Sequence, residues 1–329
     1  MGAVREEMLT FARLRADSPV RSLPIDAVLR CGHPNVGSKS VVSFVWTACL
    51  IRLFPQPSAI CMPHIPPAIG IIGGMGPAAG LDLADKITAQ TRARGDHDHL
   101  PVALLSYPRR IVDRSTFLFN QTDENPGIAL AEIARQLEQV GAVVAGMPCN
   151  TAHAPAIFDT IQHELDVTGH DIQLLHMIEE TVQFMKQHTP HVSCVGTLST
   201  LAVYDLQLHR APLEAAGFDV VVPDDAIKRE KVNRTIFDNT FGLKAQSHPV
   251  TATARHHLLD AIRHLRAKGA DAVVLGCTEL PLAPLVTGAD GIDDVLLIDP
   301  ADILARALIR AVAPESLRPL NDHYAAFVS

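Results

Sequence analysis

The chain repeats one pattern, in which a helix-period segment, a glycine and an apolar strand lead to a cysteine. In the first copy Gly141 is followed by AVVAGMPC, which ends at Cys149. In the second copy Gly269 is followed by ADAVVLGC, which ends at Cys277, so the spacing from glycine to cysteine is eight residues in both. Upstream of each copy, another strand runs into a turn of small residues, GGMGP or GTLST. A repeated α/β unit of this kind predicts two similar domains.

Strand and helix patterns alternate from about residue 62 onwards, which is typical of parallel sheets covered by helices. We therefore predict an α/β protein with two three-layer α/β/α domains related by a pseudo-two-fold axis. In parallel α/β sheets the ligand site lies at the carboxyl ends of the strands. Both cysteines and both small-residue turns follow strands. We expect the four loops to meet in an inter-domain cleft that holds the active site.

Composition and charge limit the partners of the chain. The net charge is −8, and we find no basic stripe with interleaved aromatic residues, so nucleic acid is not expected as a partner. The apolar run 40–54 is interrupted by Arg52 and is too short to span a bilayer, so no membrane segment is expected. The six cysteines lack CxxC or Cys/His ligand spacing, which argues against a disulfide scaffold or a metal site. Free thiols favour a cytoplasmic location.

The residues after each cysteine suggest reactive thiols. Asn150 or Thr151 follows Cys149, and Thr278 follows Cys277, and these polar residues are expected to cap helices. A helix N-terminus stabilises a thiolate and lowers the pKa of a thiol. A single strand-end cysteine is more often a structural buried residue. The duplicated pair with polar caps reverses that balance and favours function.

The turn from Gly74 to Ala79 also fits a relaxed dinucleotide-binding fingerprint after a strand. That fingerprint requires an acidic residue at the end of the second strand to bind the ribose. The second strand, PVALLSY, ends in Ser106 and Tyr107 instead. A nucleotide cofactor is therefore not expected.

The motifs MPCNTAH, GCTEL and GGMGP look like the signature of the aspartate/glutamate racemase superfamily, over about residues 67–315. Glutamate racemases carry a DSG-type first turn and GCTHYPL at the second cysteine. This chain has GGMGP and GCTELPL, which is similar to the aspartate racemase branch. The resemblance implies cofactor-independent racemisation of a small acidic amino acid, aspartate first and glutamate second, by a homodimer.

The resemblance also implies the site residues. Cys149 and Cys277 would act on opposite faces of the substrate as thiolate and thiol, with roles that swap in the reverse reaction. Which cysteine serves which enantiomer is left open by the sequence. The residues implied to hold the α-carboxylate and amino group are Gly74, Met75, Asn150, Thr151 and Thr278.

The side-chain carboxylate of the substrate requires a cation. The segment YPRRIVDRST resembles the family segment PDRT, which implies that Arg114 and the adjacent Ser115 bind this carboxylate. Lys244 matches one lysine of the stretch KGVK in some aspartate racemases. His153 and Glu279 follow the two cysteines by four and two residues. They either orient the thiols and tune their pKa, or only form hydrogen bonds on their own helix faces without a role in catalysis.

The first 61 residues show no clear α/β alternation, so we expect residues 1–61 to be an extension outside the catalytic fold. We assign residues 62–172 and 297–329 to the first domain and 173–296 to the second. The family fold implies that a helix near 300–313 returns to the first domain. Two alternatives keep the fold, namely a hydantoin racemase and a maleate cis-trans isomerase. A non-catalytic small-molecule-binding protein is disfavoured because both cysteines are intact.

Overall fold

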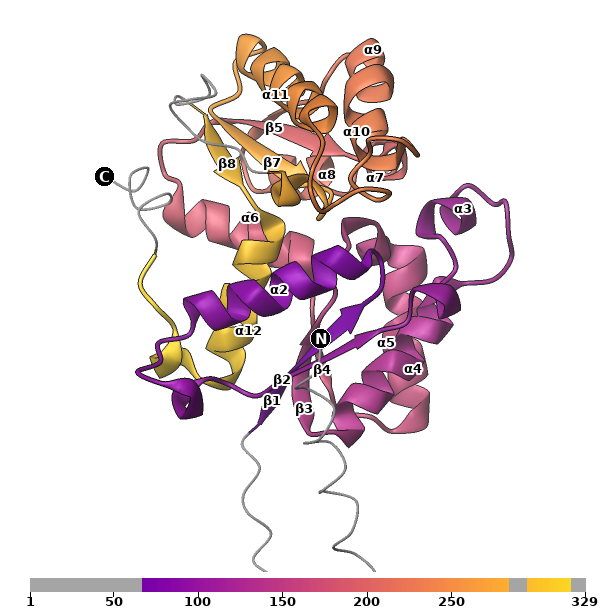
Figure 1. Cartoon of the computed structure of the whole chain (residues 1–329), viewed down its shortest axis with the longest axis vertical. Helices are drawn as coiled ribbons and strands as arrows, with labels where there is room; N and C mark the ends of the chain where they lie inside the picture. Colours follow the sequence, from indigo (N-terminus) through magenta and orange to yellow (C-terminus); the bar gives the residue numbers. More distant parts are fainter. Residues whose placement is uncertain (1–66, 284–294, 321–329) are drawn as a thin grey trace, which may run out of the picture. The chain divides into compact units, whose positions relative to one another are not determined.

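The computed structural model of the protein describes residues 67–283 and 295–320 (Figure 1). The predicted extension, residues 1–61, lies outside the described residues. Residues 62–329 make up one compact unit. Within it, the described strands form two parallel four-stranded sheets with the same order.

The first sheet has the order β2-β1-β3-β4, and the second has the order β6-β5-β7-β8. In each sheet the first strand of the repeat lies between the second and third, and all pairings are parallel. The strands are β1 (Ala68–Gly73), β2 (Val102–Ser106), β3 (Ala142–Gly146), β4 (Gln173–Leu175), β5 (Cys194–Ser199), β6 (Asp219–Val221), β7 (Ala272–Gly276) and β8 (Leu296–Ile298). The predicted fold class, two similar parallel α/β units, is confirmed.

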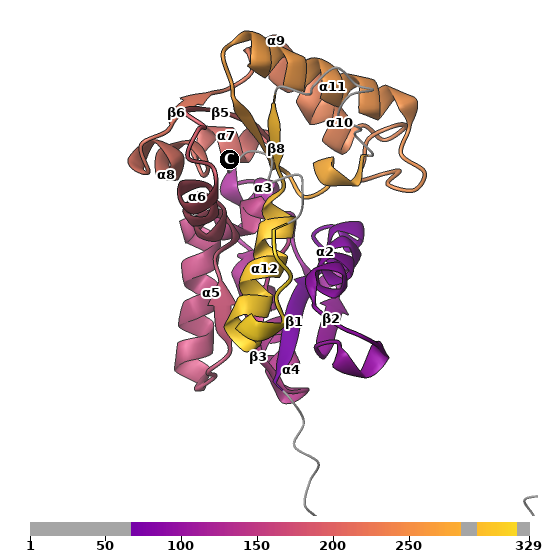
Figure 2. The same ribbon diagram turned by 90° about the vertical axis from the view of Figure 1, so that its left-hand side faces the viewer.

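Helices cover both faces of the first sheet (Figures 1 and 2). On one face, α4 (Pro126–Gln139) and α5 (Pro155–Thr168) pack against Ile72 and Ala145. On the other face, α2 (Pro77–Gln90) and α12 (Pro300–Val312) pack against Ile71. Apolar residues spaced three and four apart, such as those of α12, give each helix one buried stripe.

The second sheet is also covered on both faces. One face packs against α11 (Ala252–Ala267) and the segment that holds α10 (Arg234–Phe237). The other face packs against α6 (Met177–His188) and α8 (Arg210–Ala215). The remaining short helices are η2 (Asp96–Asp98), η3 (Pro108–Arg110), α3 (Arg114–Leu118), η4 (Asn150–His153), α7 (Leu201–Asp205), α9 (Asp225–Ile227), η5 (Lys228–Asn233), η6 (Leu280–Leu282) and η7 (Pro314–Ser316).

The two glycines of the sequence repeat end helices in the same way. Gly141 follows α4 with φ 96°, and Gly269 follows α11 with φ 94°. These angles lie in the left-handed region, where glycine lacks the steric penalty of other residues. Each glycine therefore turns the chain from a helix into the third strand of its sheet, at the end of which a cysteine follows.

The strand pairings bear on the predicted domain division. Gln173–Leu175 pairs with β3 in the first sheet, a few residues beyond the predicted end of the first domain at 172. Leu297 and Ile298 pair with β7 in the second sheet. The chain then enters α12, which packs on the first sheet (Figure 2). Strand membership thus suggests changes of domain after Leu175 and Ile298, and the division itself stays a prediction.

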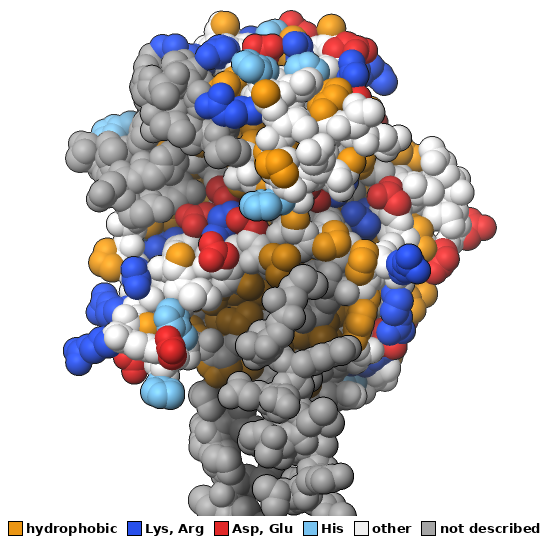
Figure 3. All heavy atoms as spheres, in the orientation of Figure 1, with side chains coloured by type: hydrophobic (Ala, Val, Ile, Leu, Met, Phe, Trp, Pro, Cys, Tyr) orange, Lys and Arg blue, Asp and Glu red, His pale blue; other side chains and the backbone are white. Residues whose placement is uncertain are grey.

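On the face drawn in Figure 3, Lys and Arg side chains lie interspersed with Asp and Glu side chains. This face of the described residues therefore offers no continuous basic surface of the kind that binds nucleic acid. A search of the described residues finds no helix with the length and hydropathy needed to cross a membrane.

Candidate active site

One cavity brings together most of the residues predicted from the sequence. The predicted residues that line it are Met75, Arg114, Ser115, Cys149, Asn150, Thr151, Lys244, Cys277, Thr278 and Glu279. Four further residues line it without being among the predicted site residues. Asp113 lies in YPRRIVDRST, Thr200 ends the turn GTLST and Gly276 precedes Cys277, whereas Phe237 lies in none of the motifs above. Gly74 and His153 are not among the lining residues. The cavity volume is about 20 Å³, room for about one water molecule.

Cys149 follows β3 by three residues and is only 5% exposed. Its carbonyl oxygen accepts a hydrogen bond from Nδ1 of His153 at 2.9 Å. His153 is buried, and burial, followed by the charge of His176, lowers its pKa to about 3. Neutral His153 therefore supports the backbone of the cysteine loop, and its hydrogen bond to Cys149 goes to the carbonyl oxygen rather than to the thiol.

Arg114 is a cation in contact with Cys149. It opens α3, whose N-cap Asp113 accepts a hydrogen bond from the Thr116 amide. Its Nη2 donates to the Met75 carbonyl at 3.3 Å, and its Nε has no partner among the described residues. Burial lowers the pKa of Arg114, but its contact with Cys149 and the charge of Asp113 more than offset this and raise it. The Arg114 guanidinium thus lies in contact with the Cys149 side chain.

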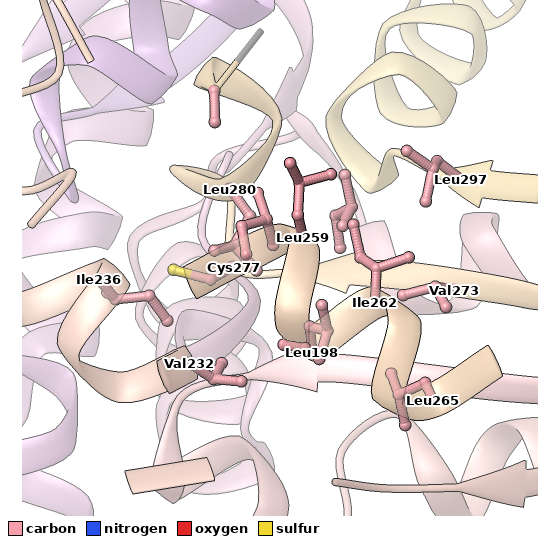
Figure 4. Close-up of a cluster of buried hydrophobic side chains, with 14 of the residues drawn as sticks. Leu198, Val232, Ile236, Leu259, Ile262, Leu265, Val273, Cys277, Leu280 and Leu297 are labelled. Carbon is pink, nitrogen blue, oxygen red and sulfur yellow. The ribbon is translucent and has the colours of Figure 1, made fainter. Parts of the chain in front are cut away.

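Cys277 follows β7 directly and is also 5% exposed. Figure 4 shows it at one end of the apolar cluster that α11 forms with the second sheet, its sulfur turned away from Leu265 and Val273. Its Sγ donates a hydrogen bond to Oε2 of Glu279 at 3.0 Å. Burial and then the charge of Glu279 raise the pKa of the Cys277 thiol well above its usual range.

The carboxylate of Glu279 has two further partners. Its Oε1 accepts hydrogen bonds from Nζ of Lys244 at 2.6 Å and from the Gly76 amide at 3.1 Å. The Lys244 ammonium also lies 5.8 Å from the centre of the Phe237 ring. Burial lowers the pKa of Lys244, but Glu279 and the two cysteines raise it to a net value above the usual range. Lys244 thus lies in the cavity already paired with a buried carboxylate.

The amide of Asn150 is oriented by a residue that sequence reasoning missed. Nε2 of His209 lies 2.9 Å from Oδ1 of Asn150. Burial, followed by the charge of His176, lowers the pKa of His209 to about 4, so the ring is neutral and Nε2 donates. Nδ2 of Asn150 has no partner among the described residues and remains a donor for a ligand. His209 precedes α8, and no local motif links it to Asn150, which lies 59 positions earlier.

The prediction that polar residues cap helices after the cysteines is wrong. Helix α5 begins at Pro155, and neither it nor η4 has a side-chain cap. After Cys277 the next helix among the described residues is the three-residue η6, again without a side-chain cap. Thr278 instead donates to the Pro148 carbonyl at 2.8 Å and ties the two cysteine loops together. The expected lowering of the Cys277 pKa by a helix dipole is also wrong, because burial and Glu279 dominate.

Comparisons with known proteins agree with the resemblance in the motifs. A family model described as Asp/Glu/Hydantoin racemase matches residues 72–308. A broad-specificity amino-acid racemase of Bacillus subtilis (strain 168) is 24% identical over 216 residues, which cover 64% of this chain and 85% of that protein.

Two solved structures have similar folds. Picrophilus torridus aspartate racemase shares 28% identity with a TM-score of 0.63, covering 80% of this chain and 100% of that chain. An aspartate racemase homologue from Pyrococcus horikoshii shares 27% identity with a TM-score of 0.55, covering 75% of this chain and 99% of that chain. The predicted similarity to the aspartate racemase branch is confirmed.

Proposed function

The chain belongs to the Asp/Glu/hydantoin racemase family, and from this membership we propose that it interconverts L- and D-aspartate without a cofactor. At the coarser level the chain is an isomerase of the racemase type. The observation that supports the finer proposal is that Cys149 and Cys277 line one cavity together with the cation Arg114.

The two thiols supply the proton chemistry. One cysteine, as thiolate, removes the Cα proton, and the other, as thiol, returns a proton to the opposite face of the resulting carbanion. Donors aimed at the α-carboxylate stabilise the charge that develops there. Nδ2 of Asn150 and the hydroxyl of Thr151 are the donors that we assign to this role, whereas the Thr278 hydroxyl already donates to the Pro148 carbonyl.

Arg114 is the residue that we assign to the side-chain carboxylate of aspartate. Its guanidinium is buried, and its planar fork suits bidentate contact with a carboxylate. Ser115, next in the chain, also lines the cavity and can donate its hydroxyl. Aspartate is preferred over glutamate because two of the structural relatives are described as aspartate racemase and its homologue.

The test is incubation of the full chain with single enantiomers of aspartate and of glutamate in deuterated water, without added cofactor. We expect racemisation of aspartate with deuterium incorporated at Cα, unchanged after dialysis against a chelator. Exchange that is faster with glutamate would correct the substrate. No exchange with any acidic amino acid would contradict the proposal and favour a hydantoin racemase or a maleate isomerase, which the same preparation can be tested for.

A further inference from the structure

The cysteines of the two matched motifs lie beside charges of opposite sign. Cys149 is in contact with the guanidinium of Arg114, and Cys277 donates a hydrogen bond to the carboxylate of Glu279. Glu279 is 2% exposed, so its charge is poorly screened by water. A buried cation favours the thiolate form of a neighbouring cysteine, and a buried carboxylate favours the thiol.

We propose that Glu279 is a positioning residue that keeps Cys277 in its thiol form in the substrate-free enzyme, with Lys244 limiting the strength of this effect. The inference rests on the proposed function for its catalytic meaning, but the protonation state of Cys277 can be measured without any substrate.

The hydrogen bond itself supports the proposal. Sγ of Cys277 lies 3.0 Å from Oε2 of Glu279 and can donate to it only while the thiol keeps its proton. Loss of that proton would leave a thiolate and a carboxylate in contact in a buried site, which is strongly unfavourable. Burial of the sulfur acts in the same direction as Glu279.

The surroundings hold Glu279 in this position. Lys244 and the Gly76 amide both donate to Oε1, which leaves Oε2 for the thiol. Gly76 is suited to this contact, because a Cβ at this position would lie 3.0 Å from Oε1. A further ionisable group coupled to Cys277 is Tyr204, a phenol whose pKa is raised chiefly by burial and which is therefore neutral. Lys244 is thus the opposing charge, and it favours the thiolate.

The arrangement has a consequence for the reaction. With Cys277 held as a thiol, proton removal by the free enzyme falls to Cys149, which lies beside Arg114. The enantiomer whose Cα–H faces Cys149 then reacts directly. The other enantiomer requires the proton of Cys277 to be relocated first.

The test follows the alkylation of Cys277 by iodoacetamide in the full chain as a function of pH, with peptide mass spectrometry as the readout. The thiolate is the reactive form, so the midpoint of the rate profile reports the protonation of this residue. We expect Glu279→Gln to move the midpoint down by about one to three pH units, the size of shift that one neighbouring charge produces. Lys244→Met should move it up, and Glu279→Asp should remain close to the unmodified chain.

Controls separate this effect from a change in packing. Glu132→Gln removes an exposed carboxylate that binds Arg110 outside the cavity, and it should leave the Cys277 midpoint unchanged. An unchanged midpoint in Glu279→Gln overturns the inference. If that variant does not fold, Lys244→Met decides, because an absent upward shift also overturns it. Failure of the unmodified chain to exchange Cα protons would refute the proposed function but would leave the midpoints measurable.

Discussion

At the residue scale, Cys149 and Cys277 follow the third strand of their own sheets but differ in their neighbours. Arg114 lies beside the first thiol, and Glu279 accepts a hydrogen bond from the second. A racemase requires one group that takes a proton and another that gives one, so unequal surroundings suit a pair with identical side chains. The difference between the two surroundings arises from Arg114, which lies outside the repeated unit, and from Glu279, which lies two positions after Cys277.

Replacement of either cysteine should remove racemisation. Because each thiol is assigned one of the two proton transfers, we expect Cys149→Ala and Cys277→Ala each to lower the rate at least about 100-fold. Circular dichroism of single enantiomers of aspartate over time measures the loss. Cys194→Ala is the matched control, since Cys194 is a free cysteine in β5 that does not line the cavity. A wild-type rate in either catalytic variant would refute the two-base mechanism.

Arg114→Lys tests the assignment of the side-chain carboxylate. The substitution keeps the charge but loses the bidentate fork, so kcat/KM for aspartate should fall about 10- to 100-fold, the range for a charged hydrogen bond. Arg110→Lys is the control, because Arg110 is exposed and pairs with Glu132. Equal effects in the two variants, or none in Arg114→Lys, would contradict the assignment.

At the element scale, the loops after the strands owe their positions to contacts between distant segments. The η4 loop after Cys149 is supported by His153 from within and by His209 from the segment before α8. Thr278 joins the loop after β7 to the Pro148 carbonyl. The contacts of His209 and Thr278 cross between the two sheets, so the site depends on the packing of both.

Stability should fall in mild acid because His209 is buried in its neutral form. Its pKa is about 4 in the folded chain, below the value of 6.5 expected for an unfolded chain. Between these values the unfolded state binds the proton and the folded state does not, so stability is present above pH 6.5 and is lost as the pH falls towards 4. From pH 7.5 to pH 5 this residue alone should cost about 2 kcal/mol of unfolding free energy.

His209→Gln tests this expectation, since an amide can still donate to Asn150 but does not titrate. Urea denaturation at pH 7.5 and pH 5 should show a smaller loss of stability in this variant, by about 2 kcal/mol. His256→Gln, on the exposed side of α11, should retain the pH dependence of the unmodified chain. If both variants lose as much unfolding free energy between pH 7.5 and pH 5 as the unmodified chain does, the burial of neutral His209 is not the cause of the acid sensitivity.

The sequence predicted features that repeat locally and missed those that depend on distant partners. Periodicity and spacing located both strand–cysteine units, because Gly141 and Gly269 end their helices in the same way. His209 was missed because its contact with Asn150 arises only in the folded chain. The predicted caps were wrong because Pro155 starts α5 and the threonine of the second motif binds a carbonyl of the first loop.

At the scale of the whole molecule, the two sheets share one strand order, and two helices connect them. Helix α6 contributes Met177 to the core of the first sheet and Met185 to that of the second. Helix α12 continues from β8 of the second sheet and packs mainly on the first. Any movement of one sheet relative to the other therefore has to be accommodated by these two helices.

A chain that starts at Met62 should fold and racemise like the full chain. Residues 62–329 make up one compact unit, and the family match begins at residue 72. The described core clusters and the cavity draw on residues after 67. We therefore expect the thermal midpoint of the shortened chain to stay within a few degrees of that of the full chain. Its kcat/KM should stay within about twofold, as for removal of a segment outside the core. Loss of cooperative unfolding in the shortened chain would show that residues 1–61 belong to the catalytic fold.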